Sequence, residues 1–222
     1  MSLETSKTLG GIGAILLLVG AVGFFVQPAV AFAAFIGVIL SLVALHGLAD
    51  YYRERGIFNN ALWGFIALVV GVIVAAAALI YLFLYTDVLT QLVQAIYPTW
   101  NGNWSTPPTG PTVSPQNLDI TKLIPPITTL LEVYAIFCVF VVIASFFVWR
   151  SLKQVGAKSN IGLFGTAGIL LFIGGILSVL IIGFVLMAIA VLLMAIAFFE
   201  LRPQPQQPAA TAAPLVSTPT PV

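Results

Sequence analysis

Two long stretches of this sequence carry no formal charge, and their length constrains the fold more than any other feature. Between Lys7 and Asp50 lie 42 uncharged residues, and between Lys158 and Glu200 lie another 41. About 20 apolar residues in a helix cross a hydrocarbon core of roughly 30 Å. A single helix spanning either stretch would be about 60 Å long, at about 1.5 Å per residue. Each stretch is therefore predicted to enter the membrane and return as a hairpin.

The composition supports an integral membrane protein and excludes several classes of function. Apolar residues make up 60% of the chain and charged residues 7%, whereas soluble domains carry about 25% charged residues. A net charge of +1 predicts no nucleic-acid partner. Cys138 is the only cysteine, which excludes an intramolecular disulfide and a cysteine-rich metal site. No cofactor-binding motif is present.

Apolar length, together with the positions of charges and prolines, predicts an all-α bundle of six transmembrane helices. The first two and the last two helices form similar hairpins that flank a central helix pair, and residues 1–201 make one membrane domain. The predicted spans cover roughly residues 9–26, 29–49, 60–86, 126–149, 161–181 and 184–200. Residues 87–125 form an outer loop, and residues 202–222 are predicted to be a disordered tail rich in Pro, Ala and Thr.

Basic residues predict the orientation of these spans. Six spans put both termini on one side, and that side holds seven of the eight basic residues, namely Lys7, Arg53, Arg55, Arg150, Lys153, Lys158 and Arg202. The positive-inside rule makes both termini cytoplasmic and the loop 87–125 extracellular, in the plasma membrane. A signal peptide cleaved near Ala31 is the alternative for the N-terminus, but the apolar sequence continues through that point. Basic residues in the two cytoplasmic loops fit either topology anchoring or contact with anionic lipid headgroups.

The outer loop contains one predicted helix and one candidate modification site. Apolar residues recur at helical spacing over 88–96, which predicts a short helix lying in the outer interface. Residues 98–115 are rich in Pro, Thr and Gly and are predicted to be irregular. Asn103 begins an Asn-Trp-Ser triplet on the side where N-glycosylation occurs, although such triplets also arise by chance.

Glycines recur along the predicted helices and indicate close packing between them. The two hairpins align at an offset of 155 residues, which pairs Gly10 with Gly165 and Gly20 with Gly175. Small residues on one helix face let helix backbones approach closely in lipid. The packing positions predicted in this way are Gly10, Gly13, Gly20, Gly64, Gly71, Gly165, Gly168 and Gly175. The alignment fits a parallel duplication, as found in some transporters, or the chance similarity of glycine-rich apolar sequence.

Few residues offer chemistry. His46 is the only histidine, and Asp50 lies one helical turn away, but no third ligand is suitably spaced for a metal. Glu132 lies within the fourth apolar segment, where a carboxylate marks either an ion path or the headgroup region. Cys138 is predicted to be a packing residue. No catalytic, cofactor-binding or metal-binding residues are predicted.

Several short motifs resemble a known family. These are LETSKTLGGIG at residues 3–13, GLADYY at 47–52, GIFNNA at 56–61 and AIAFF at 195–199. In them the chain resembles the membrane proteins grouped as domain of unknown function 996, which are found largely in archaea. The resemblance implies a multi-pass membrane protein and brings no catalytic residues with it.

These features predict a non-enzymatic structural or accessory membrane protein. Its expected partners are the lipid bilayer and either other membrane subunits or further copies of itself. A small transporter or channel that uses Glu132 as its ionisable site is the alternative.

Overall fold

The computed structural model describes residues 2–23, 26–106, 108 and 120–203, and every regular element in these residues is helical. The long helices are α1 (Leu3–Gly23), α2 (Ala31–Tyr51), α3 (Arg55–Tyr85), α5 (Ile120–Ser159), α6 (Gly162–Ile176) and α7 (Ile181–Glu200). The shorter elements are α4 (Val88–Ile96) and the 3₁₀ turns η1 (Pro28–Val30) and η3 (Leu177–Val179). Six helices in the described residues have the length and apolar composition to cross a membrane, which confirms the predicted fold class.

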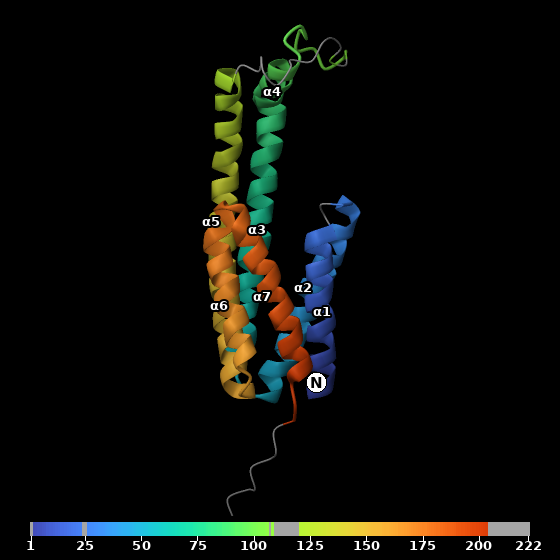
Figure 1. The fold of residues 1–222 in the computed structure, drawn as a ribbon, viewed down its shortest axis with the longest axis vertical. Helices are drawn as coiled ribbons and strands as arrows, with labels where there is room; N and C mark the ends of the chain where they lie inside the picture. The colour runs from blue at the N-terminus through green and yellow to red at the C-terminus, as the bar shows by residue number, and fades with distance from the viewer. Residues whose placement is uncertain (1, 24–25, 107, 109–119, 204–222) are drawn as a thin grey trace, which may run out of the picture.

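The two hairpins and the central pair differ in length (Figure 1). Helices α3 and α5 have 31 and 40 residues, or about 46 and 60 Å at 1.5 Å per residue. The hairpins α1–α2 and α6–α7 are shorter and flank the lower part of this pair, while α4 lies at its far end. The end that holds the N-terminus, the α2–α3 turn and the α5–α6 turn is called the basal end, and the opposite end the distal end.

Both ends of the described chain meet at the basal end. The Lys7 ammonium on α1 donates a hydrogen bond to the backbone carbonyl of Leu201, at 3.1 Å. Leu201 is fully buried and follows directly after α7. The hairpins therefore start and finish at the same end of the bundle.

The main core fills the basal half. Its buried residues come from every long helix, and among them the rings of Phe164 and Phe198 pack edge to face with their centroids 5.2 Å apart. A second, smaller core lies at the distal end, where Val88 of α4 packs with Leu82 of α3 and Val133 of α5. The short helix α4 has the bounds that its apolar spacing predicts, and it buries Val88 and Ala95.

Several helices begin earlier than hydropathy predicts. Helix α1 starts at Leu3 and α3 at Arg55, so polar residues occupy their first turns. Asn60 lies within α3, where its side-chain amide donates a hydrogen bond to the Gly56 carbonyl at 2.8 Å. Hydropathy indicates which part of a helix contacts lipid. The helix itself can extend into water, because water and side chains can satisfy the backbone groups at its end.

Helix α5 also starts before the predicted boundary and runs through Pro125 and Pro126. Each proline removes one backbone donor. The carbonyls that these donors would have reached, four residues earlier, lie in the first turn of α5. The two missing backbone hydrogen bonds therefore affect only the start of the helix, and α5 remains continuous.

Candidate functional site

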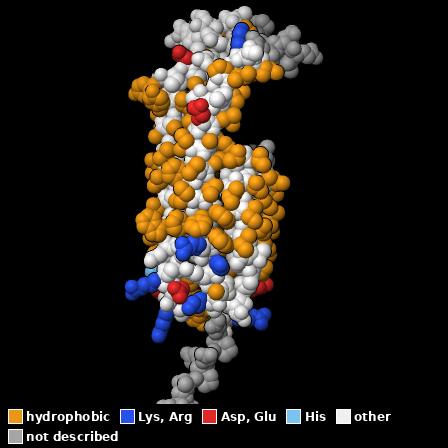
Figure 2. Space-filling model, turned by 90° about the vertical axis from the view of Figure 1, so that its left-hand side faces the viewer, with side chains coloured by type: hydrophobic (Ala, Val, Ile, Leu, Met, Phe, Trp, Pro, Cys, Tyr) orange, Lys and Arg blue, Asp and Glu red, His pale blue; other side chains and the backbone are white. Residues whose placement is uncertain are grey.

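Lysine and arginine side chains gather at the basal end, below a broad apolar band (Figure 2). One ion pair links the two basal turns, with Lys158 Nζ at 3.2 Å from Glu54 Oε2. Nearby, the buried Ser151 hydroxyl donates to the Ile57 carbonyl at 2.7 Å and so ties α5 to α3. The basal end is therefore charged on its surface and tightly packed beneath it.

A hollow of about 540 Å³ lies along α5 at this end. Its lining residues are Phe146, Trp149, Arg150, Lys153, Gln154 and Ala157. The Arg150 guanidinium lies 5.9 Å from the centre of the Phe146 ring, and the Lys153 ammonium lies 5.7 Å from the Trp149 ring. Both cations thus rest on aromatic faces, and the ion pairs among the described residues include neither of them. We call this feature the basal hollow.

Two polar atoms at the basal hollow are buried without a partner. Trp149 Nε1 and Gln154 Oε1 have no hydrogen bond within the described part of the chain. The Trp149 ring stacks on Phe172 of α6 at 5.4 Å and 11°, which fixes the indole against the bundle. An indole N–H only donates, so this atom lacks an acceptor.

The basal hollow was not predicted from the sequence as a site, although the signal was present. Phe146, Arg150, Lys153 and Ala157 recur every three or four residues and so share one face of α5. The sequence identified its two basic residues only as part of a cytoplasmic loop. In the structure they belong to the helix itself.

Glu132 lies on the outside of the bundle. Its side chain is exposed, whereas the neighbouring Val133 is buried. Just below it along α5, the Tyr134 hydroxyl donates to the Ser178 carbonyl in the turn of the α6–α7 hairpin. The 17 residues between Glu132 and Arg150 carry no charge. Along the helix axis, Glu132 and Arg150 are about 27 Å apart at about 1.5 Å per residue, which is close to the thickness of the hydrocarbon core.

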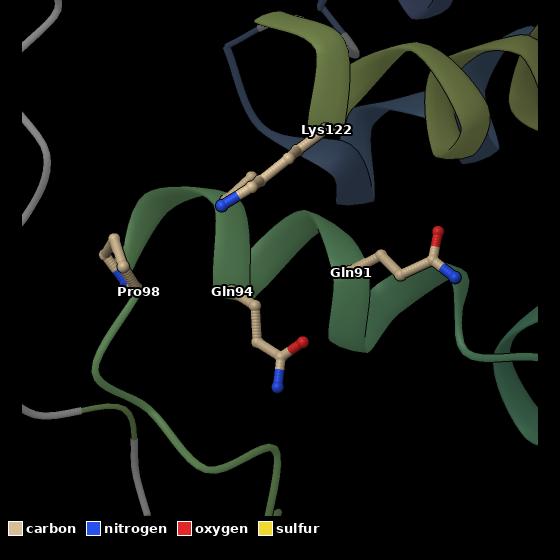
Figure 3. Close-up of a pocket in the computed structure, with 5 residues that line it drawn as sticks. Gln91, Gln94, Pro98 and Lys122 are labelled. Carbon is tan, nitrogen blue, oxygen red and sulfur yellow. The ribbon is translucent and has the colours of Figure 1, made fainter. Parts of the chain in front are cut away.

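A second hollow, of about 420 Å³, lies at the distal end beside α4. Lys122 extends from α5 across α4, with Gln94 and Pro98 near it and Gln91 farther along the helix (Figure 3). One cation and two neutral amides line this hollow, whereas two cations line the basal hollow.

The remaining candidate residues lie apart from both hollows. His46 Nε2 lies 3.6 Å from Asp50 Oδ2, and both side chains are more than half exposed. The described residues include no cluster of three or more His, Cys, Asp or Glu that could hold a metal. Cys138 is buried. Asn103 is exposed in an irregular segment, where its side chain accepts a hydrogen bond from the Ser105 amide at 2.9 Å.

One tyrosine at the basal end has a perturbed acidity. Burial raises the pKa of the Tyr52 phenol above its usual value, and the neighbouring Tyr51 adds to the shift. The Tyr52 hydroxyl is buried without a hydrogen-bond partner among the described residues. Ionising this group in the folded protein is therefore unfavourable.

The glycines of the first hairpin lie at backbone contacts. A Cβ at Gly13 would approach the Gly37 carbonyl to 2.8 Å, and one at Gly20 would approach the Ala34 amide to 2.1 Å. A Cβ at Gly10 would instead meet the ring of Phe198 on α7, at 2.3 Å. Helix α1 therefore uses its glycines to pack against two different helices.

The glycines of the second hairpin have other neighbours. Gly168 and Gly175 face α5, where a Cβ would meet Trp149 at 3.0 Å and the Ser145 hydroxyl at 2.3 Å. Gly165 departs from the predicted packing role, because a Cβ there would meet no atom within 4 Å. The residues paired by the 155-residue offset thus lie in different environments. The sequence also missed Gly174, where a Cβ would come within 2.9 Å of the Gly183 carbonyl across the hairpin.

The predicted glycines of the central pair lie at the contact between α3 and α5. A Cβ at Gly64 would approach Val148 to 2.9 Å, and one at Gly71 would approach Phe140 to 2.5 Å. Residue numbers rise along α3 as they fall along α5, so the two helices are antiparallel.

Comparison with known proteins places the chain in a family. Residues 33–192 match the family described as "Protein of unknown function (DUF996)". The chain is also 25% identical, over 202 residues, to the uncharacterized protein MJ1644 of Methanocaldococcus jannaschii; this covers 90% of the chain and 94% of that protein. No solved structure matches. The matched residues include those that line the basal hollow. Because the match covers well over half of the sequence, the chain belongs to the DUF996 family.

Proposed function

We propose that this protein is a non-enzymatic structural or accessory membrane protein, acting as a subunit of a larger membrane complex or as a homo-oligomer. One observation carries the proposal. Within the described residues, the polar or charged residues that are buried as a whole are five serines, namely Ser6, Ser41, Ser145, Ser151 and Ser178. The carboxylates, amines and imidazole of the described residues lie outside both cores.

These serines support a packing role. Ser145 donates to the Val142 carbonyl of its own helix at 2.9 Å, and Ser6 donates at 3.2 Å to the carbonyl of Ser2, just before α1. Ser151 joins two helices through the Ile57 carbonyl. Catalysis and ion transport need ionisable or metal-binding groups that converge on one point. Among these serines, Ser151 is the one with a described hydrogen bond to another helix. The Ser41 and Ser178 hydroxyls are buried without a partner among the described residues. A serine hydroxyl is neither a charged group nor a typical metal ligand, so this set fits packing better than transport.

The proposal includes an orientation. The basal end, with its basic residues, faces the cytoplasm, and the loop 87–125 faces the outside of the plasma membrane. The support is the positive-inside rule applied to an end that holds the N-terminus, Leu201 and both short turns. Tyr81 and Tyr85, exposed at the distal end of α3, have the amphipathic rings that favour the opposite interface.

The experiment is to measure the native mass of the full chain, extracted in mild detergent at endogenous expression, and to identify the chains that co-purify. We expect either a stoichiometric membrane partner or a closed homo-oligomer. The matching functional control is flux in proteoliposomes with wild-type protein and with Glu132→Gln. A specific flux that Glu132→Gln abolishes would overturn the proposal and make the protein a transporter or channel.

A further inference from the structure

We infer that the basal hollow binds the phosphate headgroup of an anionic phospholipid, with an acyl chain lying along the adjoining face of α5. The recognising groups are Arg150 and Lys153. This binding site is independent of the proposed accessory role, since it involves lipid and no protein partner.

The charge of the hollow favours an anion. Arg150 and Lys153 carry two cations one helical turn apart, and their described contacts are with the rings of Phe146 and Trp149. An aromatic face leaves the N–H donors at the edge of a cation available to an oxygen ligand. Phosphate oxygens form strong charge-assisted hydrogen bonds with such donors.

A buried donor without an acceptor is the second observation. Trp149 Nε1 is removed from water and has no partner within the described residues. The Lys153 ammonium lies over the same indole. Trp149 lines the hollow, and the flexible Lys153 side chain covers one face of its ring. In the inferred complex Lys153 turns toward the phosphate, and the indole shifts so that its N–H reaches the hollow. An oxygen acceptor from outside the chain would then satisfy the N–H.

The position of the hollow along the membrane normal favours a lipid. Arg150 is the first charged residue after the uncharged run of α5, so it lies where hydrocarbon gives way to headgroups. Basic pockets at this level of membrane proteins are suited to anionic lipid heads. A phosphate bound there would belong to the leaflet on the basal side.

The face of α5 beyond the hollow supplies the acyl-chain surface. Ile136, Val139 and Ile143 continue the helical stripe of Phe146 toward the distal end, and all three are exposed, by 47%, 58% and 41%. Within the described residues no other helix covers them. A free phosphate would gain nothing from this stripe, whereas a phospholipid would bury it.

The test is native mass spectrometry of the full chain in mild detergent, with phosphatidylglycerol and phosphatidylcholine added separately. Wild-type protein is expected to retain phosphatidylglycerol in preference to phosphatidylcholine. The double variant Arg150→Gln/Lys153→Gln is expected to bind phosphatidylglycerol at least about tenfold more weakly. The matched control Arg53→Gln/Arg55→Gln removes two charges from the same end and is expected to stay within about twofold of wild type.

A second measurement needs no variant. Phosphatidylglycerol is expected to raise the thermal midpoint of the wild-type protein more than phosphatidylcholine does, because a ligand that binds the folded state stabilises it. Equal weakening in the two double variants would overturn the inference in favour of non-specific surface attraction. Equal stabilisation by inorganic phosphate at the same concentration would overturn the lipid assignment and leave a site for free anions.

Discussion

Replacing Gly20 with alanine tests whether backbone contact holds the first hairpin together. The new Cβ would lie 2.1 Å from the Ala34 amide nitrogen and 2.6 Å from the Ala34 Cβ, where ordinary contact begins at 3.4 Å. Backbone atoms cannot turn aside as a flexible side chain does. Helices α1 and α2 must therefore separate by on the order of 1 Å, a gap that forfeits about a quarter to a half of each dispersion contact along the seam.

The energetic balance follows from two terms. Overpacking of this kind costs about 1–3 kcal/mol. Alanine gains up to about 1 kcal/mol of helix propensity over glycine, and less where the denatured state in detergent is already helical. The free energy of unfolding should thus fall by about 1–2 kcal/mol. For a protein of this size, that lowers the thermal midpoint by about 2–8 °C.

Gly165→Ala is the matched control. It makes the same substitution in a transmembrane helix, but a Cβ at Gly165 meets nothing within 4 Å. Only the propensity term remains, so the midpoint should stay constant or rise by up to about 4 °C. Thermal unfolding of both variants in one mild detergent gives the comparison. Equal destabilisation by the two substitutions would refute the reasoning, because helix composition and not the local contact would then set the stability.

Three further predictions concern other parts of the bundle. Ser151→Ala should lower the thermal midpoint by about 2–4 °C, because the hydrogen bond to Ile57 is lost; an unchanged midpoint would contradict its role between α3 and α5. Because burial raises the pKa of Tyr52, stability from the protonated phenol is present below about pH 10 and lost as pH rises through the raised value. Tyr52→Phe should therefore lose less stability than wild type in alkaline unfolding experiments. In the variant Cys138→Ala/Asn103→Cys, the introduced cysteine should react with a membrane-impermeant thiol reagent in intact cells. Labelling only after permeabilisation would reverse the proposed orientation.

The number of helices and their hairpin arrangement follow from the sequence because lipid imposes a simple rule. Every backbone polar group inside hydrocarbon must be paired within its own helix, so uncharged length translates directly into spans. The early starts of α1, α3 and α5 do not follow from that rule, since their first turns carry polar residues. The short helix α4 was predictable because its apolar spacing reflects burial at one face.

The candidate site shows where sequence reasoning ends. Basic residues at one end were evident, but their arrangement into a hollow depends on the continuation of α5 through Arg150 and Lys153. The stacking of Trp149 on Phe172 joins residues of two helices. Spacing along one chain defines a helix face, whereas the identity of the opposing helix depends on how the whole bundle packs.

The glycines make the same division clear. The sequence by itself determined that small residues line the helices, because only small side chains let backbones approach in lipid. The tertiary structure alone decided which neighbour each one meets: Gly20 faces its own hairpin partner, Gly175 faces α5, and Gly165 has open space. A glycine has no side chain that could select a partner. Its neighbour is therefore set by the larger residues around it, through the rotation and crossing of complete helices.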